Sequence, residues 1–334
     1  MISTGSDGLS LNQKIQKFTL LNESGDKWLS RRKIIGGTNT NLMELIPHKY
    51  PWAMELFRKH SEIFWSVDKI DMSKEKEDYD SLSEIEKKAF EKILCSVNSI
   101  ESLTYLNYQI VNQYITAPEV SLGFSVLQFQ NAKHAYAYSK IIESSVGLTE
   151  SENVYNVWRT SEELRKRNSL FNAKLLEFCN NPTTDNYLRN VVVCAISGTV
   201  FALTEFSLIY AMARRSKLTS SSNLLKYVHR DIREHSTFLL HVYNTTLEEN
   251  PKLSTGEFKR SISNLVREMV NIETDFVQSV SAGMIPGLSD LSIAKFSQAQ
   301  ANRVLKTANQ EIMYPGISGN PLPWFDTFAE IKSI

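Results

Sequence analysis

Hydrophobic residues recur at helical spacing along most of this chain. One apolar stripe is formed by Ala89, Phe90, Ile93, Leu94, Val97 and Ile100. Ser83 precedes this stripe and Glu86 follows three residues later, a pairing that is typical of a helix N-terminus. No glycine occurs between Gly37 and Gly123, and prolines are also sparse from Pro51 onward. Because helix breakers are this rare, the pattern predicts long helices rather than many short strands.

The apolar pattern predicts one all-α domain with helices near residues 52–65, 82–115, 119–147, 151–180, 184–215, 221–248, 256–283 and 288–310. We place these helices in a domain of residues 47–312. Residues 1–46 are rich in Ser, Gly, Asn, Lys and Arg, and we expect them to form a partly flexible N-terminal arm. Residues 313–334 carry several prolines and glycines, which predicts a turn-rich C-terminal segment.

Composition then narrows the function classes. Lys plus Arg and Asp plus Glu number 37 each, so the net charge is zero and a nucleic-acid partner is disfavoured. The three cysteines are far apart and form no metal-binding pattern, as expected for reduced thiols. The apolar run from Val191 to Leu203 is too short to span a bilayer, and the N-terminus lacks signal-peptide architecture. We therefore predict a cytoplasmic protein with no membrane partner.

Two short pieces of sequence carry candidate chemistry. Asn131-Ala-Lys-His134 and Ile232-Arg-Glu-His235 each place a histidine three residues after a partner, so both side chains share one helix face. Dimetal helix bundles use Glu-x-x-His at this spacing on two helices, with one further carboxylate from each of two others. Here the histidines are present and both glutamates are missing.

The neighbours of these histidines leave two interpretations open. Asn131, His134 and Tyr138 lie at i, i+3 and i+7, which predicts one inward stripe, while Asp231 and His235 lie on neighbouring faces of a later helix. A lone inward histidine is usually a core imidazole that is satisfied by a hydrogen bond. Two histidines in matching contexts make a shared site about as plausible as two core imidazoles, and spacing alone decides nothing further.

A wider set of segments resembles a known family. These segments are Ile46-Pro-His-Lys-Tyr-Pro-Trp52, Phe64-Trp65-Ser-Val-Asp68, residues 78–87, Arg230-Asp231 and Gly319-Asn-Pro-Leu-Pro-Trp324. With His134, Tyr138 and His235, they resemble the small, radical-carrying beta subunit of class I ribonucleotide reductase over roughly residues 40 to 326. The resemblance implies a ferritin-like helix bundle, usually a homodimer, that pairs with a large subunit where ribonucleotides are reduced.

The resemblance also implies where metal ligands would lie, and the chain departs from it there. The ligand positions of the family fall on Asp78, Asn131, His134, Gly198, Ile232 and His235. Three of the four carboxylates are therefore absent. An oxo-bridged diferric centre carries a charge of about +4, and a buried charge without anionic ligands is very costly.

We accordingly expect no cofactor, because the dimetal site is not intact. Lys133 and Arg233 stand beside the former ligands, and either one, if it turned inward, would pair with Asp78 and replace metal charge. A minor alternative is a single metal ion on Asp78, His134 and His235, which is a three-ligand set that suits zinc.

The resemblance further implies a radical apparatus. Tyr138 falls where the family carries its tyrosyl radical, and Trp65, Asp231 and His134 fall on the relay that leads to the subunit surface. The structural alternative is a hydrogen-bonded core cluster. Family members usually continue into a tail that carries a further tyrosine, whereas no tyrosine follows Tyr314 here.

Three hypotheses follow. The first is a metal-free radical subunit, in which a modified Tyr138 holds the radical after activation by another protein. The second is a catalytically silent paralogue that pairs with a ligand-complete small subunit as a structural or regulatory partner. The third is a bundle whose centre is repurposed, because glycine at position 198 would open space for a small molecule.

Overall fold

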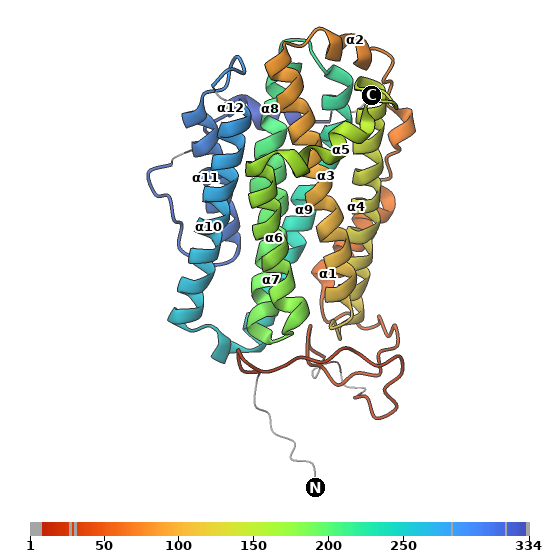
Figure 1. Cartoon of the computed structure of the whole chain (residues 1–334). Helices are drawn as coiled ribbons and strands as arrows, with labels where there is room; N and C mark the ends of the chain where they lie inside the picture. Colours follow the sequence, from red (N-terminus) through yellow and green to blue (C-terminus); the bar gives the residue numbers. More distant parts are fainter. Residues whose placement is uncertain (1–8, 27–28, 30–31, 282, 318, 332–334) are drawn as a thin grey trace.

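The computed structural model describes residues 9–26, 29, 32–281, 283–317 and 319–331, and it shows an elongated helix bundle (Figure 1). The long helices are α1 (Pro51–Glu62), α3 (Glu84–Asn112), α4 (Pro118–Ser145), α6 (Glu162–Asn180), α9 (Thr219–Glu249), α10 (Gly256–Ser281) and α11 (Asp290–Thr307). Shorter elements are α2 (Glu75–Asp80), α5 (Ser151–Thr160), α7 (Thr184–Ile196), π-helix η3 (Ser197–Ala202), α8 (Leu203–Ala213) and α12 (Pro323–Ala329). Within the described residues, β-structure is limited to two isolated bridges. The predicted all-α class is confirmed.

Local sequence explains where several helices begin. Ser83 and Glu86 form the predicted capping box of α3, in which each side chain accepts a hydrogen bond from the other residue's backbone N–H. Pro51 and Pro118 occupy the first turns of α1 and α4, where a missing N–H costs nothing.

Two predicted helices are divided in the structure. The helix predicted over 151–180 breaks at Ser161, whose side chain accepts a hydrogen bond from the Leu164 N–H and starts α6. The helix predicted over 184–215 contains the π-helical turns of η3, an irregularity that hydrophobic periodicity does not reveal. Periodicity also missed α2 and α12, because six and seven residues are too few to show it.

The most apolar helical stretch lies in the core. Thr184–Ala213 has the length and hydropathy of a membrane span, but 89% of its apolar window is buried inside the protein. It packs against α9, α6 and α11, so it is the central helix of the bundle. On the other side of α9, Gly123 lets α4 approach Phe238, because a Cβ at this position would lie 2.3 Å from the ring.

The N-terminal arm runs across one end of the bundle (Figure 1). Its backbone is attached there by hydrogen bonds from the Ile15 N–H to the Pro182 carbonyl at 2.8 Å and from the Thr116 N–H to the Ile34 carbonyl at 2.8 Å. The predicted arm and C-terminal segment extend into residues 1–8, 27–28, 30–31, 318 and 332–334, which lie outside the described residues.

Candidate functional site

A small cavity lies between α3, α4, α9 and the junction of α7 with η3, and we call it the central cavity. Its volume is about 20 Å3, which is room for about one water molecule. The residues that line it are Ile100, Glu101, Thr104, Tyr108, Asn131, Cys194, Ser197, Gly198, Ile232, His235 and Ser236. This lining combines polar side chains from the predicted site with several that the sequence argument did not single out.

His134 lies beside this cavity between two carboxylates. Its Nδ1 is 3.2 Å from Glu101 Oε1, and its Nε2 is 3.5 Å from Asp231 Oδ2, an ion-pair contact that is too poorly aligned for a hydrogen bond. The Trp65 indole N–H donates to the same Asp231 oxygen at 2.8 Å. The structure therefore brings the predicted relay residues Trp65, Asp231 and His134 together.

Tyr138 is fully buried one helical turn beyond His134. Its hydroxyl donates to Glu101 Oε1 over 3.5 Å, so Glu101 contacts both His134 and Tyr138. Burial, and then the Glu101 carboxylate, raise the pKa of Tyr138 well above its ordinary value. The phenol is therefore neutral, and a carboxylate stands ready to accept its proton.

The two histidines differ in charge. Burial alone would lower the pKa of His134, but the Glu101 and Asp231 carboxylates raise it to about 9. Burial, followed by the positive charge on His134, lowers the pKa of His235 well below its ordinary value. Near neutral pH the site thus holds one imidazolium, at His134, and one neutral imidazole, at His235. The His235 Nε2–H donates to Gln130 Oε1 at 2.6 Å.

At the three positions where the family has carboxylates and this chain does not, the residues make a neutral hydrogen bond or pack against each other. The Asn131 amide donates to Thr104 Oγ1 at 2.9 Å. A Cβ on Gly198 would lie 2.9 Å from Ile232 Cγ2, so the isoleucine fills the space beside the glycine. The expectation that Gly198 opens a small-molecule site is wrong, because the remaining cavity accommodates only a molecule the size of water.

The placement of Asp78 was wrong. Its carboxylate accepts hydrogen bonds from the Thr219 N–H at 3.2 Å and hydroxyl at 3.4 Å, at the start of α9. Thr219 precedes His235 by sixteen residues on that helix, which separates them by about 24 Å. Glu101 occupies the acidic position of the site instead. The sequence signal was available, since Glu101 lies four residues after Val97 and continues the inward stripe of α3.

The suggested charge substitutes also lie elsewhere. Lys133 Nζ lies 4.2 Å from the centroid of the Trp65 ring, in a cation–π contact outside the cavity. Arg233 pairs with Asp326 on α12. Neither side chain enters the site, so the buried positive charge there belongs to His134.

These residues do not fit a dimetal centre. Among the described residues, Glu101 is the only carboxylate that lines the cavity, and both nitrogens of His134 face carboxylates rather than the cavity. In the described part of the chain, no group of three His, Cys, Asp or Glu side chains could hold a metal ion. The alternative of one metal ion on Asp78, His134 and His235 is also wrong, because the Asp78 carboxylate is bound at the start of α9, far from both histidines.

A second buried polar cluster holds the bundle near Tyr138. Arg167 pairs with Glu205 and, at 2.6 Å, with Glu273, and it donates to Ser96 at 2.7 Å. Burial raises the pKa of Glu205 to about 7 although Arg167 opposes this, and burial raises the pKa of Glu273 well above its ordinary value. Sequence reasoning missed this cluster because its members lie on four different helices.

Comparison with known proteins gives a consistent result. A family model for "Ribonucleotide reductase, small chain" matches residues 42–321. The chain is 27% identical over 322 residues to ribonucleoside-diphosphate reductase subunit beta of Treponema pallidum, which covers 96% of this chain and 92% of the relative. The ribonucleotide reductase R2 subunit from Clostridium botulinum matches with a TM-score of 0.92 and 28% identity, over 96% of this chain and 100% of the other. The dimanganese(II) NrdF of Streptococcus sanguinis matches with a TM-score of 0.75 and 19% identity, over 86% and 98% of the two chains, which is a likeness of fold alone.

Proposed function

The chain belongs to the ribonucleotide reductase small-chain family, and from that premise we propose that it is a metal-free small subunit whose Tyr138 carries a tyrosine-derived radical. Membership implies a large-subunit partner and a homodimer. The large subunit would perform the reduction of ribonucleotides, and the radical would start each turnover. An activating protein would supply the first oxidation, with or without added oxygen on the tyrosine ring.

One contrast supports this proposal. The radical position and the relay remain connected, through Trp65, Asp231 and His134, while the ligand positions Asn131, Gly198 and Ile232 are filled by an amide contact and close packing. A site that had lost all function would be expected to lose both sets.

The chain's own residues supply what a stored radical needs. Oxidation of Tyr138 removes one electron and the phenolic proton, and Glu101 Oε1 at 3.5 Å is placed to receive that proton. The imidazolium at His134 offsets one of the two carboxylate charges, and the Arg230 guanidinium, 3.1 Å from Asp231 Oδ1, offsets the other without a metal ion. Burial excludes water from the phenoxyl oxygen, since Tyr138 is fully buried. The electron would leave and return through His134, Asp231 and Trp65.

The test is electron paramagnetic resonance and intact mass on protein freshly isolated from cells that depend on the enzyme. We expect a tyrosine-derived radical with far less than one equivalent of transition metal, and we expect Tyr138→Phe to abolish it. The absence of both a radical and added oxygen on Tyr138 would contradict the proposal.

A structural role is the alternative, and one feature favours it. The cluster of Arg167, Glu205 and Glu273, together with the contact of Ile232 with Gly198, stabilises the bundle centre without any metal. Under this alternative the chain would form a heterodimer with a ligand-complete small subunit. Purification as a homodimer that shows no affinity for such a paralogue would count against it.

A further inference from the structure

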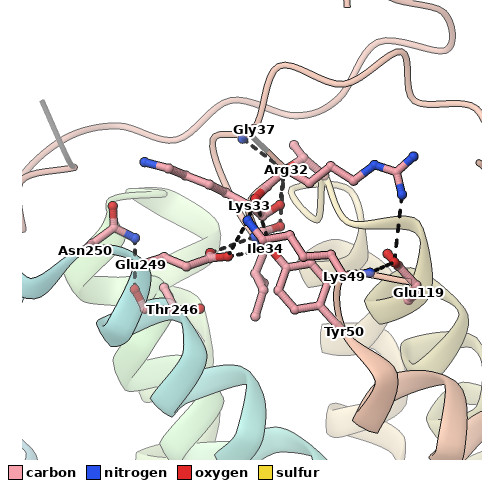
Figure 2. Close-up of polar contacts among 11 residues, drawn as sticks. Arg32, Lys33, Ile34, Gly37, Lys49, Tyr50, Glu119, Thr246, Glu249 and Asn250 are labelled. Carbon is pink, nitrogen blue, oxygen red and sulfur yellow. Dashed lines mark hydrogen bonds and ion pairs between the residues drawn. The ribbon is translucent and has the colours of Figure 1, made fainter. Parts of the chain in front are cut away.

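The segment that ends in Tyr50-Pro51-Trp52 has no part in the proposed radical relay, yet the structure gives its aromatic residues a defined setting. Tyr50 is 2% exposed, and its hydroxyl lies 3.3 Å from the backbone carbonyl of Arg32 in the N-terminal arm. Its hydroxyl donates to Glu249 Oε1 near the end of α9, and Figure 2 shows this contact beside arm residues Arg32 and Ile34.

Two further contacts fix the position of the Glu249 carboxylate that accepts the Tyr50 hydrogen bond. Its Oε2 accepts a hydrogen bond from the Ile34 N–H at 3.0 Å, and Lys49 Nζ lies 3.5 Å from Oε1. Burial, and then Glu249, raise the pKa of Tyr50 far above its ordinary value, so the phenol is neutral. Tyr50 therefore resembles Tyr138 in its two key properties, burial and a carboxylate that is ready to accept the phenolic proton.

A line of aromatic rings connects this tyrosine to the central cavity. The ring centroids are 6.1 Å apart for Tyr50 and Trp52, 5.6 Å for Trp52 and Phe238, 5.5 Å for Phe238 and Phe124, and 5.9 Å for Phe124 and Tyr108. Tyr108 lines the cavity two helical turns beyond Glu101 on α3. Each spacing is that of packed aromatic pairs.

Two features make this line more than ordinary packing. The line begins and ends at a tyrosine, Tyr50 and Tyr108, and Trp52 follows Tyr50. Tyrosine and tryptophan are the readily oxidised ring types, and two phenylalanines fill the interval between Trp52 and Tyr108. Gly123 also permits the central contact, because any Cβ there would lie 2.3 Å from the Phe238 ring. The line ends at Tyr50 against the N-terminal arm, whereas the Trp65 relay leaves the site through His134 and Asp231.

We propose that Tyr50 is a second radical-holding tyrosine, connected to the central cavity through Trp52, Phe238, Phe124 and Tyr108. The exchange with Tyr138 rests on the proposed function. In that exchange one electron passes from Tyr50 to the Tyr138 phenoxyl radical. The Tyr50 proton moves to Glu249, and the proton held by Glu101 returns to Tyr138, so that a phenol and a phenoxyl exchange places with no other reactant. When the large subunit does not use the radical, a cellular one-electron reductant such as a thiol would reduce the Tyr50 phenoxyl, and Glu249 would return the proton to Tyr50.

The first experiment does not depend on a radical at Tyr138. Full-length Tyr138→Phe protein, labelled with ring-deuterated tyrosine, is oxidised by flash photolysis with ruthenium tris-bipyridine and persulfate. We expect a long-lived phenoxyl signal that falls several-fold when Tyr50→Phe is added. The matched control is Tyr243→Phe, since Tyr243 is equally buried but its hydroxyl meets the Gln310 amide instead of a carboxylate. Equal signals in the Tyr50 and Tyr243 variants would overturn the proposal.

The second experiment tests the connection in protein that retains Tyr138. The lifetime of the Tyr138 radical should increase several-fold in Tyr50→Phe and in Trp52→Phe, and it should be unchanged in Tyr243→Phe. An unchanged lifetime in the first two variants would refute the connection. If no variant shows a radical at Tyr138, the proposed function fails, and the photolysis experiment alone decides the role of Tyr50. Melting temperatures show whether each phenylalanine variant is folded.

Discussion

The packing of Ile232 against Gly198 yields the sharpest prediction about the former metal positions. Replacing Gly198 with alanine places a Cβ 2.9 Å from Ile232 Cγ2, and overpacking of this kind costs about 1–3 kcal/mol. Alanine in a helix gains about 1 kcal/mol over glycine. Gly198→Ala alone should therefore be neutral or destabilising by up to about 2 kcal/mol.

A double-mutant cycle combines this change with Ile232→Ala, which removes the Cγ2 methyl group that the new Cβ would meet. Ile232 is 2% exposed, and Ile232→Ala should cost about 2–5 kcal/mol through lost burial and a larger cavity. In the double variant the steric conflict disappears and the new methyl group fills part of that cavity. We expect the double variant to be about 1–2 kcal/mol more stable than the sum of the single changes predicts.

The assay is chemical denaturation at one fixed protein concentration, because dimer stability depends on concentration. Gly198→Ala combined with Ile34→Ala is the matched control. Ile34 is a fully buried isoleucine in the arm that bonds Glu249, seventeen residues along α9 from Ile232. That pair should be additive within about 0.5 kcal/mol. Equal additivity for Gly198 and Ile232 would refute the claim that the isoleucine has taken the vacated space.

Three further predictions concern charge and the relay. Arg167→Met leaves two buried carboxylates without their cation, so thermal or denaturant unfolding should show a loss of about 3–5 kcal/mol, and glutamine at both carboxylate positions should restore much of it. The folded pKa of His134, about 9, lies above the unfolded value of about 6.5, so its contribution of about 3 kcal/mol is complete below pH 6.5 and lost as the pH rises through 9. Melting temperature against pH should show this decline in the wild type and not in His134→Gln. Trp65→Phe should abolish turnover with the large subunit while the Tyr138 radical signal persists, and unchanged turnover would exclude Trp65 from the relay.

The sequence predicted the bundle well because long amphipathic helices leave a periodic signal. The pattern placed α3, α4 and α9 within a few residues of their ends, and the Ser83 capping box fixed one start. The division at Ser161 was missed, since a serine can either cap a helix or lie within one.

The site was predicted less completely, for reasons that differ by residue. Trp65, Asp231, His134 and Tyr138 were found through resemblance; the first three lie in contact, and Tyr138 is joined to His134 through Glu101. Asp78 was taken as the acidic position and Glu101 was not considered, although helix register, rather than acidity, decides which carboxylate faces the cavity.

The directions of the Lys133 and Arg233 side chains could be determined only from the folded structure. A basic residue beside a former ligand tells nothing about its direction, which depends on partners far away in sequence. The partner of Arg233 is Asp326 on α12, a helix that periodicity did not predict. Lys133 lies over Trp65, which is distant in sequence and adjacent in space.

Under the proposed function, this subunit keeps the geometry of a radical site without the ligands of a dimetal centre. Anomalous X-ray scattering from crystals grown with excess Mn(II) tests it most directly. We expect no anomalous peak within bonding distance of Glu101, His134 and His235, and ordinary electron density for at most about one water molecule in the cavity. A manganese ion bonded to Glu101 and His235 would contradict it.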